Sequence, residues 1–145
     1  MAIDSKYTAH ATSVGGRGGG TAKTSDGALD VKLDHPVELG GKGDGVNPEQ
    51  LFAIGYSSCY LGAMKFVAAN KMDPKVTLDP SSSATAHVSF GPRDDGEGFG
   101  IAVVMDVNLP GVDKAVAQQI ADKAHVVCPY SHATKGNIDV KTNIV

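Results

Sequence analysis

Residues 47–70 have the sequence NPEQLFAIGYSSCYLGAMKFVAAN. The first four letters indicate a helix start, because Asn47 can cap free backbone N–H groups, Pro48 suits the first helical position and Gln50 completes a capping box. The letters that follow are apolar on nearly every face, which is typical of a helix buried inside a protein. Because the stretch is shorter than a membrane span and interrupted by polar residues, we expect the central helix of a domain or of a dimer.

Alternating apolar residues on both sides of this helix predict β-strands. These strands are expected near residues 6–13, 29–33, 84–90, 101–109 and 138–144. A turn sequence at 91–96 joins two of them into a predicted hairpin. Helical spacing of apolar residues after Asp113, which can act as a cap, predicts a second helix that Pro129 should end. This order predicts an α+β fold, and the chain length suits a single domain over residues 1–145.

Composition and charge exclude several classes of function. The formal net charge of −3 gives no electrostatic reason to bind nucleic acid or an anionic membrane. We find no apolar run of signal-peptide length at the N-terminus and no run of about 20 apolar residues anywhere. The 2 cysteines are too few for a disulfide-stapled secreted scaffold. We therefore expect a cytoplasmic protein with reduced thiols and neither nucleic acid nor membrane as a partner.

Cys59 and Cys128 carry the candidate chemistry, although a lone cysteine is more often an inert packing residue. An attacking thiol must be ionised, and burial in the middle of a helix raises the pKa of a thiol. Cys59 therefore needs a cation, and Arg17, isolated among five glycines, is the candidate, although composition alone favours an exposed loop residue. Glu49 is available to hold a buried arginine. Cys128 lies at a predicted helix C-terminus, which disfavours a thiolate and suits a thiol that reacts second.

Seven motifs of the chain, spread in order over nearly its whole length, resemble the organic hydroperoxide resistance (Ohr) family of the OsmC superfamily. They are YTAHAT (7–12), GGR (15–17), LDVKL (29–33), NPEQLFA (47–53), GYSSC (55–59), CPYS (128–131) and GNIDV (136–140). The resemblance implies an OsmC-like fold, with strands flanking a long buried central helix, in an intertwined homodimer. It also implies that Cys59 is the peroxidatic cysteine and Cys128 the resolving one, and that Arg17 and Glu49 form the charged pair that activates the thiolate and binds the peroxide.

The same resemblance implies a thiol-dependent peroxidase that acts as an antioxidant in the oxidative stress response. It would reduce organic hydroperoxides to alcohols through a Cys59 sulfenic acid and a Cys59–Cys128 disulfide. No cofactor is implied beyond an external dithiol, the dihydrolipoyl groups of lipoylated proteins. We expect Phe52, Met64 and Phe66 either to offer an apolar wall to bulky alkyl peroxides or to be plain core.

Two functions of other classes stay open at this point. His125, Cys128 and His132, with Cys59 as a fourth ligand, have spacings that can supply zinc ligands, although no C-x-x-C or H-x-x-x-H pair supports such a site. A structural or ligand-binding module with two inert buried cysteines is the other alternative.

Helix geometry raises the question of which subunit Glu49 serves. Glu49 and Cys59 are ten residues apart, which corresponds to about 15 Å along one helix. Two antiparallel copies of the helix would instead bring Glu49 of one subunit toward Cys59 of the other, and the small residues Gly55, Ser58 and Gly62 would let such helices approach closely. We therefore predict a site shared between subunits.

Overall fold

The computed structural model describes residues 2–145. The chain divides into two compact units, Met1–Leu51 and Phe52–Val145, each described below by itself. The single domain expected over residues 1–145 is not tested by this division and stays a prediction.

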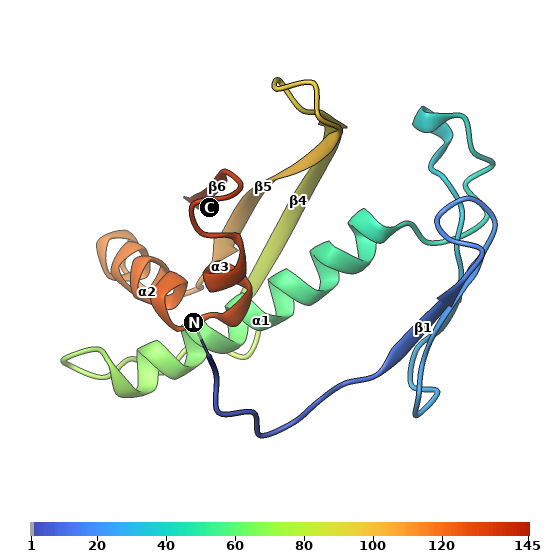
Figure 1. The fold of residues 1–145 in the computed structure, drawn as a ribbon. Coiled ribbons are helices and arrows are strands. Elements are labelled where there is room, and N and C mark those ends of the chain that lie inside the picture. Colours follow the sequence, from blue (N-terminus) through green and yellow to red (C-terminus); the bar gives the residue numbers. More distant parts are fainter. Residues whose placement is uncertain (1) are drawn as a thin grey trace. The chain divides into compact units, whose positions relative to one another are not determined.

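The first unit is a small antiparallel sheet in which each strand pairs with the next (Figure 1). Its strands are β1 (Ala11–Val14), β2 (Thr21–Thr24) and β3 (Asp30–Lys32), and a 3-10 helix, η1 (Val37–Leu39), follows. The strand expected at 6–13 begins only at Ala11, and the one expected at 29–33 is β3. The sequence did not indicate β2, because its four residues lack an apolar alternation.

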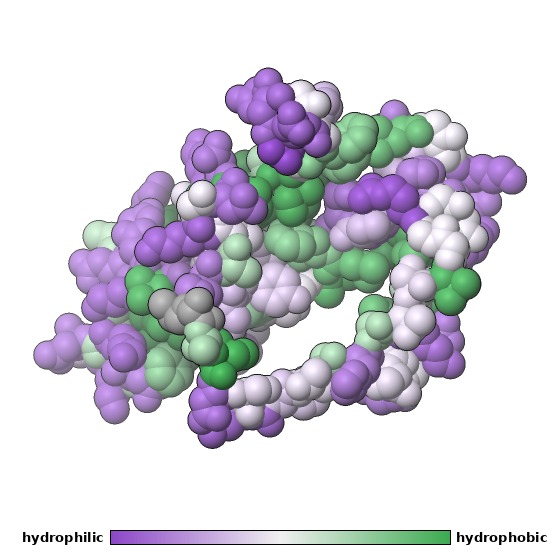
Figure 2. Space-filling view, in the orientation of Figure 1, coloured by the Kyte–Doolittle hydropathy of each residue, from purple (hydrophilic) through white to green (hydrophobic). Residues whose placement is uncertain are grey.

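The second unit pairs a three-stranded sheet with helices. Its strands are β4 (Ser83–Pro92), β5 (Phe99–Asn108) and β6 (Val140–Ile144). The predicted hairpin is confirmed, since β4 and β5 pair in antiparallel register. β6 runs parallel to β5 and is reached through α2 (Lys114–Val127) and α3 (Pro129–Thr134), because a parallel pair needs a crossover connection. Figure 2 shows hydrophilic side chains gathered over the tip of the hairpin.

The central helix, α1 (Pro48–Asn70), starts as predicted. The Gln50 N–H donates to Asn47 Oδ1 and the Asn47 N–H donates to Gln50 Oε1, both at 2.9 Å, which is the reciprocal pattern of a capping box. The helix has 23 residues, so the expectation that it is shorter than a membrane span is wrong. α1 is long and apolar enough to count as a candidate membrane span by length and composition alone. The core helix of a soluble protein also meets these two criteria.

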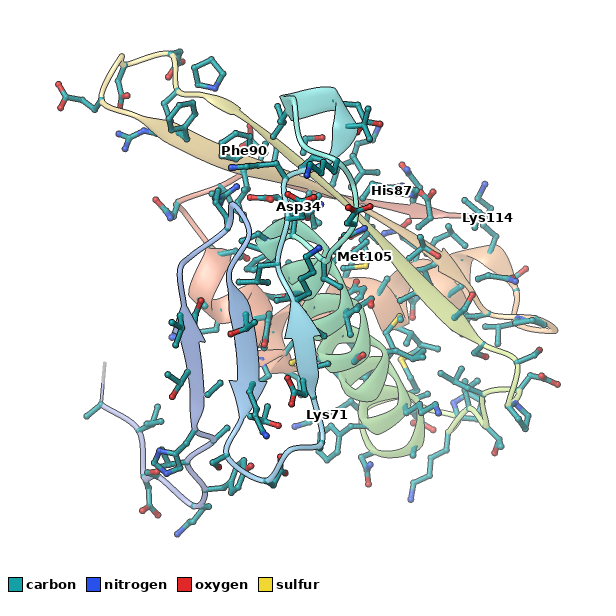
Figure 3. All side chains as sticks on the ribbon, turned by 90° about the vertical axis from the view of Figure 1, so that its right-hand side faces the viewer. Asp34, Lys71, His87, Phe90, Met105 and Lys114 are labelled. Carbon is teal, nitrogen blue, oxygen red and sulfur yellow. The ribbon has the colours of Figure 1, made fainter. Side chains whose placement is uncertain are left out.

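α1 buries one face rather than all of them. Its fully buried side chains pack with residues of β5 and α2 in one hydrophobic core, and they are Tyr56, Tyr60, Met64, Val67 and Ala68. Met105, labelled in Figure 3, lies on the core face of β5 and is fully buried.

The rest of α1 is less covered. Ile54 and Phe66 are 62% and 47% exposed, although both are large and apolar. The sequence predicted a helix buried on nearly every face. This prediction is wrong for the single chain, in which a strip of α1 that includes Ile54 and Phe66 is exposed to solvent.

The limits of α2 agree with the sequence pattern, whereas α3 was not predicted. Asp113 caps α2 as expected, its side chain accepting from the Ala115 N–H at 2.9 Å, and Cys128 ends it. Pro129, expected only to end a helix, also occupies the first turn of α3. A proline cannot donate at that position, where a helical N–H would have no partner in any case, so the same residue both stops one helix and begins the next.

Candidate active site

Cys59 and Cys128 lie next to each other in the second unit, although 69 positions separate them in sequence. Their sulfurs are 3.4 Å apart and both thiols are free. Cys59 projects from the middle of α1 and is partly exposed, whereas Cys128 is fully buried between α2 and α3. A disulfide joins sulfurs at about 2.05 Å, so a shift of little more than about 1 Å would bond them.

Cys128 belongs to two helix ends at once. Its backbone N–H closes α2 on Ala124, while its sulfur accepts the backbone N–H of Ser131 at 3.5 Å at the start of α3. The sequence predicted only the C-terminus of α2 beside this thiol, and α3 corrects that prediction, since the sulfur also faces a helix N-terminus. Accessibility, rather than helix polarity, distinguishes the two thiols: only Cys59 is exposed enough to meet a substrate first.

The surroundings of Cys59 in this unit oppose its ionisation. Burial is the main cause that raises the pKa of the Cys59 thiol, and the neighbouring Cys128 raises it further. The backbone N–H of Tyr130 acts in the opposite direction by hydrogen-bonding the sulfur. A nucleophilic Cys59 at neutral pH therefore requires a positive charge in addition to these groups.

Arg17 and Glu49 form a bidentate ion pair in the first unit. Arg17 Nη2 donates to Glu49 Oε1 at 3.0 Å and Nη1 donates to Oε2 at 3.3 Å. The side chains are 38% and 14% exposed, so Glu49, in the first turn of α1, is the better buried partner. The two planar groups match in shape, which fixes the orientation of the guanidinium.

Glycine makes the Arg17 loop possible. Gly16 has a φ of +68°, a left-handed conformation that side chains disfavour. A Cβ on Gly20 would lie 2.2 Å from the Val14 carbonyl oxygen, so the chain can close this turn only without a side chain there. The structure thus joins the four predicted site residues as two pairs, one in each unit.

The apolar wall expected from the sequence is only partly present. Phe52 packs against Tyr56 and Tyr130, with ring centroids 5.8 and 6.0 Å apart. Met64 is fully buried in the core, and Phe66 is exposed, so neither is a wall in the single chain. Tyr130 was missed, because one aromatic residue after a proline carries no periodic signal.

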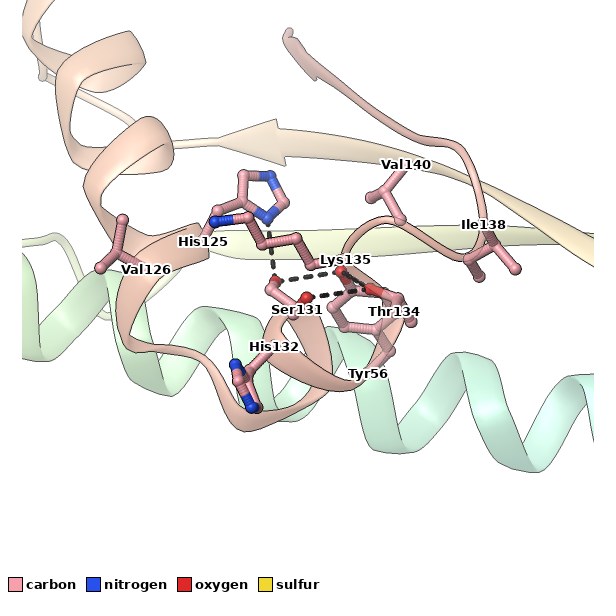
Figure 4. A pocket seen from close by; sticks show the side chains of 9 residues that line it. All are labelled: Tyr56, His125, Val126, Ser131, His132, Thr134, Lys135, Ile138 and Val140. Carbon is pink, nitrogen blue, oxygen red and sulfur yellow. Dashed lines mark hydrogen bonds between the residues drawn. The ribbon is translucent and has the colours of Figure 1, made fainter. Parts of the chain in front are cut away.

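A polar network beside the cysteines was also missed (Figure 4). Tyr56 Oη lies 3.0 Å from Ser131 Oγ and 3.3 Å from Thr134 Oγ1. His125 Nδ1 lies 2.9 Å from the same Ser131 oxygen, and Nε2 lies 2.8 Å from Thr142 Oγ1. All of these residues except Thr142 line a pocket of about 420 Å³. Spacing along the chain offers no sign of the network, because it joins three helices and a strand.

This network also bears on the zinc alternative. Both ring nitrogens of His125 are engaged by hydroxyl groups, which removes the first of the suggested ligands. Within residues 2–145, we find no group of three or more histidine, cysteine or acidic side chains placed to hold a metal ion.

The family model of OsmC-like proteins matches residues 41–143 of this chain. An organic hydroperoxide resistance protein of Xanthomonas axonopodis pv. citri (strain 306) is 56% identical over 135 residues, which cover 92% of this chain and 91% of the relative. A crystal structure of an organic hydroperoxide resistance protein from Legionella pneumophila has a TM-score of 0.87 at 40% identity, covering 97% of this chain and 98% of that one. The crystal structure of OhrB of Bacillus subtilis has a TM-score of 0.85 at 38% identity, covering 97% and 100%.

The chain belongs to the OsmC-like family, in the branch of the organic hydroperoxide resistance proteins. The predicted α+β, OsmC-like fold is confirmed. The intertwined homodimer stays a prediction, because the structure describes one chain.

Proposed function

We propose that this protein is a cysteine-based peroxidase that reduces organic hydroperoxides to alcohols. The observation that carries the proposal is the cysteine pair: two free sulfurs 3.4 Å apart, of which only Cys59 is partly exposed. A thiol that reacts first must be reached by substrate, and one that reacts second must lie within bonding reach of the first. The names of the relatives, which concern resistance to organic hydroperoxides, support the same substrate class.

In the first step the Cys59 thiolate attacks the peroxide oxygen distal to carbon. An S–O bond forms and the O–O bond breaks, so the sulfur is oxidised to a sulfenic acid and the leaving alkoxide takes up a proton to become the alcohol. We assign to Arg17 the stabilisation of the thiolate and of the alkoxide, and to Glu49 the orientation of Arg17 through the bidentate pair. The raised pKa of Cys59 within its own unit is the physical reason that such a cation is needed.

In the second step the Cys128 thiol attacks the Cys59 sulfenic acid. The S–S bond forms, the S–O bond breaks, and the hydroxide leaves as water with the thiol proton. An external dithiol then returns both cysteines to thiols by exchange and becomes oxidised itself. We propose dihydrolipoyl groups as this dithiol, no bound cofactor, and the cytoplasm as the place of action.

A homodimer is the proposed active form. The apolar side chains of Ile54 and Phe66 on α1 are exposed in the single chain, and a second copy would remove them from water. A Cβ added at Gly62 would meet no atom within 4 Å, which leaves room on the same helix, whereas the space at Gly55 is already occupied by Tyr130 of its own chain. Gly55 was expected to let two helices approach closely, but the contact with Tyr130 of its own chain is enough to explain why a glycine is needed there.

Subunit mixing tests whether the site is shared. Cys59→Ser and Glu49→Ala chains, each nearly inactive alone, are combined and allowed to exchange. Recovered activity supports a site built from two subunits, and background activity after exchange confirmed by native mass spectrometry assigns Glu49 to the cysteine of its own chain.

Turnover with cumene hydroperoxide is the direct test of the function. We expect rapid consumption with dihydrolipoamide and slow consumption with thioredoxin. Thiol titration before and after one equivalent of peroxide should show the loss of two thiols. If both thiols persist, the cysteines are inert and the peroxidase proposal is wrong.

A further inference from the structure

The turn Cys128–Ser131 touches both sulfurs. The Ser131 N–H donates to Cys128 Sγ at 3.5 Å, and the Tyr130 N–H hydrogen-bonds Cys59. The position of this turn therefore sets the distance and direction between the two sulfurs. Whatever holds the turn in place controls how readily they can bond.

The Ser131 side chain anchors the turn to the rest of the unit. Its hydroxyl meets Tyr56 of α1 on one side and His125 of α2 on the other, and the serine is only 5% exposed. Tyr56 is fully buried, so its hydroxyl has no access to bulk water as a substitute partner. Loss of the serine hydroxyl would remove the partner of the partly buried His125 Nδ1 and leave the buried Tyr56 hydroxyl with only the longer contact to Thr134 Oγ1, at 3.3 Å.

The contacts of this network can be satisfied when His125 is neutral. A neutral imidazole has one donor and one acceptor nitrogen, so Ser131 and Thr142 take opposite roles toward the His125 ring. Burial lowers the pKa of His125, which favours this neutral form. Tyr56 Oη completes the network, since it lies within reach of both Ser131 Oγ and Thr134 Oγ1.

We infer that Ser131, held between Tyr56 and His125, is a positioning residue for the condensation of oxidised Cys59 with Cys128. This inference rests on the proposed peroxidase function. Ser131 acts through the turn rather than on the substrate, so its main effect should fall on the second step. In that second step the S–S bond forms, the S–O bond of the sulfenic acid breaks and water leaves.

The test separates the two steps in the full-length protein. One equivalent of cumene hydroperoxide is mixed with the reduced chain, and quenched samples are analysed by intact mass for sulfenic acid, disulfide and over-oxidised forms. In Ser131→Ala we expect condensation to slow about tenfold or more, with sulfenic acid accumulating, because geometry and a buried hydrogen bond are both lost. The rate of Cys59 oxidation should fall much less than the rate of condensation.

Ser82→Ala is the matched control. Ser82 is also buried, and its hydroxyl has no hydrogen-bond partner among residues 2–145, so neither step should change. Ser131→Thr keeps the hydroxyl beside the pocket and should restore most of the condensation rate, which a loss of general stability would not explain. Tyr56→Phe removes the tyrosine hydroxyl that contacts Ser131. If Ser131→Ala does not fold, Tyr56→Phe takes its place in the test.

Two results have distinct meanings. Condensation at the wild-type rate in Ser131→Ala, or in Tyr56→Phe where the first does not fold, overturns the inference while leaving the peroxidase function intact. A wild-type protein that forms neither sulfenic acid nor disulfide overturns the proposed function instead.

Discussion

The Arg17–Glu49 pair and the Cys59–Cys128 pair are held in place by different means. A turn closed by backbone hydrogen bonds and glycines carries Arg17, whose side chain stays 38% exposed. The sulfurs instead lie against a packed core and a network of buried side chains. The first region supplies charge on a partly exposed arginine, and the second supplies close packing with little charge.

This contrast indicates how one small chain can meet two opposing needs. Close packing brings two sulfurs within 3.4 Å, but it also raises the pKa of the thiol that must ionise. A permanent guanidinium answers the second need, and an exposed, glycine-rich turn is a suitable place to keep one without a large desolvation cost. Changes in the two regions should therefore affect different steps.

The largest effect is expected from the cysteines themselves. Cys59→Ser should abolish peroxide reduction, because no other thiol is exposed to attack first. Cys128→Ser should still consume one equivalent and then stall as sulfenic acid or become over-oxidised. Intact mass after one equivalent of cumene hydroperoxide distinguishes these products. Equal loss of the first oxidation in both variants would contradict the assigned roles.

A strong effect on the first step alone is expected from Arg17→Ala. A charge within about 4–6 Å commonly shifts a pKa by roughly one to three units, and each unit changes the thiolate fraction about tenfold. Attack on peroxide at pH 7 should therefore slow by about tenfold or more, with partial recovery in Arg17→Lys. Alkylation rates measured against pH report the Cys59 pKa directly. The control is Arg93→Ala, at an exposed arginine paired with Asp95. An unchanged Cys59 pKa in Arg17→Ala would refute the role of Arg17 in stabilising the thiolate.

A moderate effect on packing is expected from Gly55→Ala. A Cβ at Gly55 would lie 2.8 Å from the Tyr130 hydroxyl, so the ring and its turn must move. Overpacking of this kind costs about 1–3 kcal/mol and should slow disulfide formation. A Cβ at Gly62 in the same helix meets no atom of its own chain within 4 Å, so Gly62→Ala should cost little within the single chain and any larger loss of stability would report the proposed helix pair. Denaturant unfolding of both variants measures the difference, and equal stabilities would show that the Tyr130 contact is unimportant.

The smallest effect is expected in the dependence of stability on pH. Burial lowers the folded-state pKa of His125, with Asp122 opposing it, so the unfolded chain binds a proton that the folded chain resists. The contribution to stability is therefore fully present above the unfolded pKa of about 6.5 and is lost as pH falls below it. His125→Gln should reduce the loss of stability between about pH 7 and 5. Parallel curves for wild type and His125→Gln would exclude this role of His125.

Sequence patterns predicted much of the fold because its main elements are local. The capping box of residues 47–50, the alternation of β4 and β5 and the Asp113 cap each depend on neighbours in the chain, and all three are present. α3 was missed because six residues after a proline give no periodic pattern. The exposed strip of α1 was missed because apolar composition cannot say which faces the rest of one chain covers.

The residues of the candidate site also differ in whether the sequence could indicate them. Residue chemistry offered Cys59, Cys128, Arg17 and Glu49 as candidates, the family resemblance gave them roles, and the structure joins them in two pairs. The network around Ser131 could not be predicted, because its members come from α1, α2, α3 and β6, and each is an ordinary polar residue taken alone. Such networks are a property of tertiary packing.

The sulfur of Cys128 doubles as the acceptor that starts α3, and this makes the amide of Ser131 a spectroscopic reporter. When Cys128 bonds to Cys59 it gives up its proton and becomes a weaker, displaced acceptor for that N–H. The Ser131 amide resonance should then shift, and its exchange with solvent deuterium should accelerate, each time the pair is oxidised. A single backbone signal would thus follow the redox cycle in real time without any chemical label on the thiols.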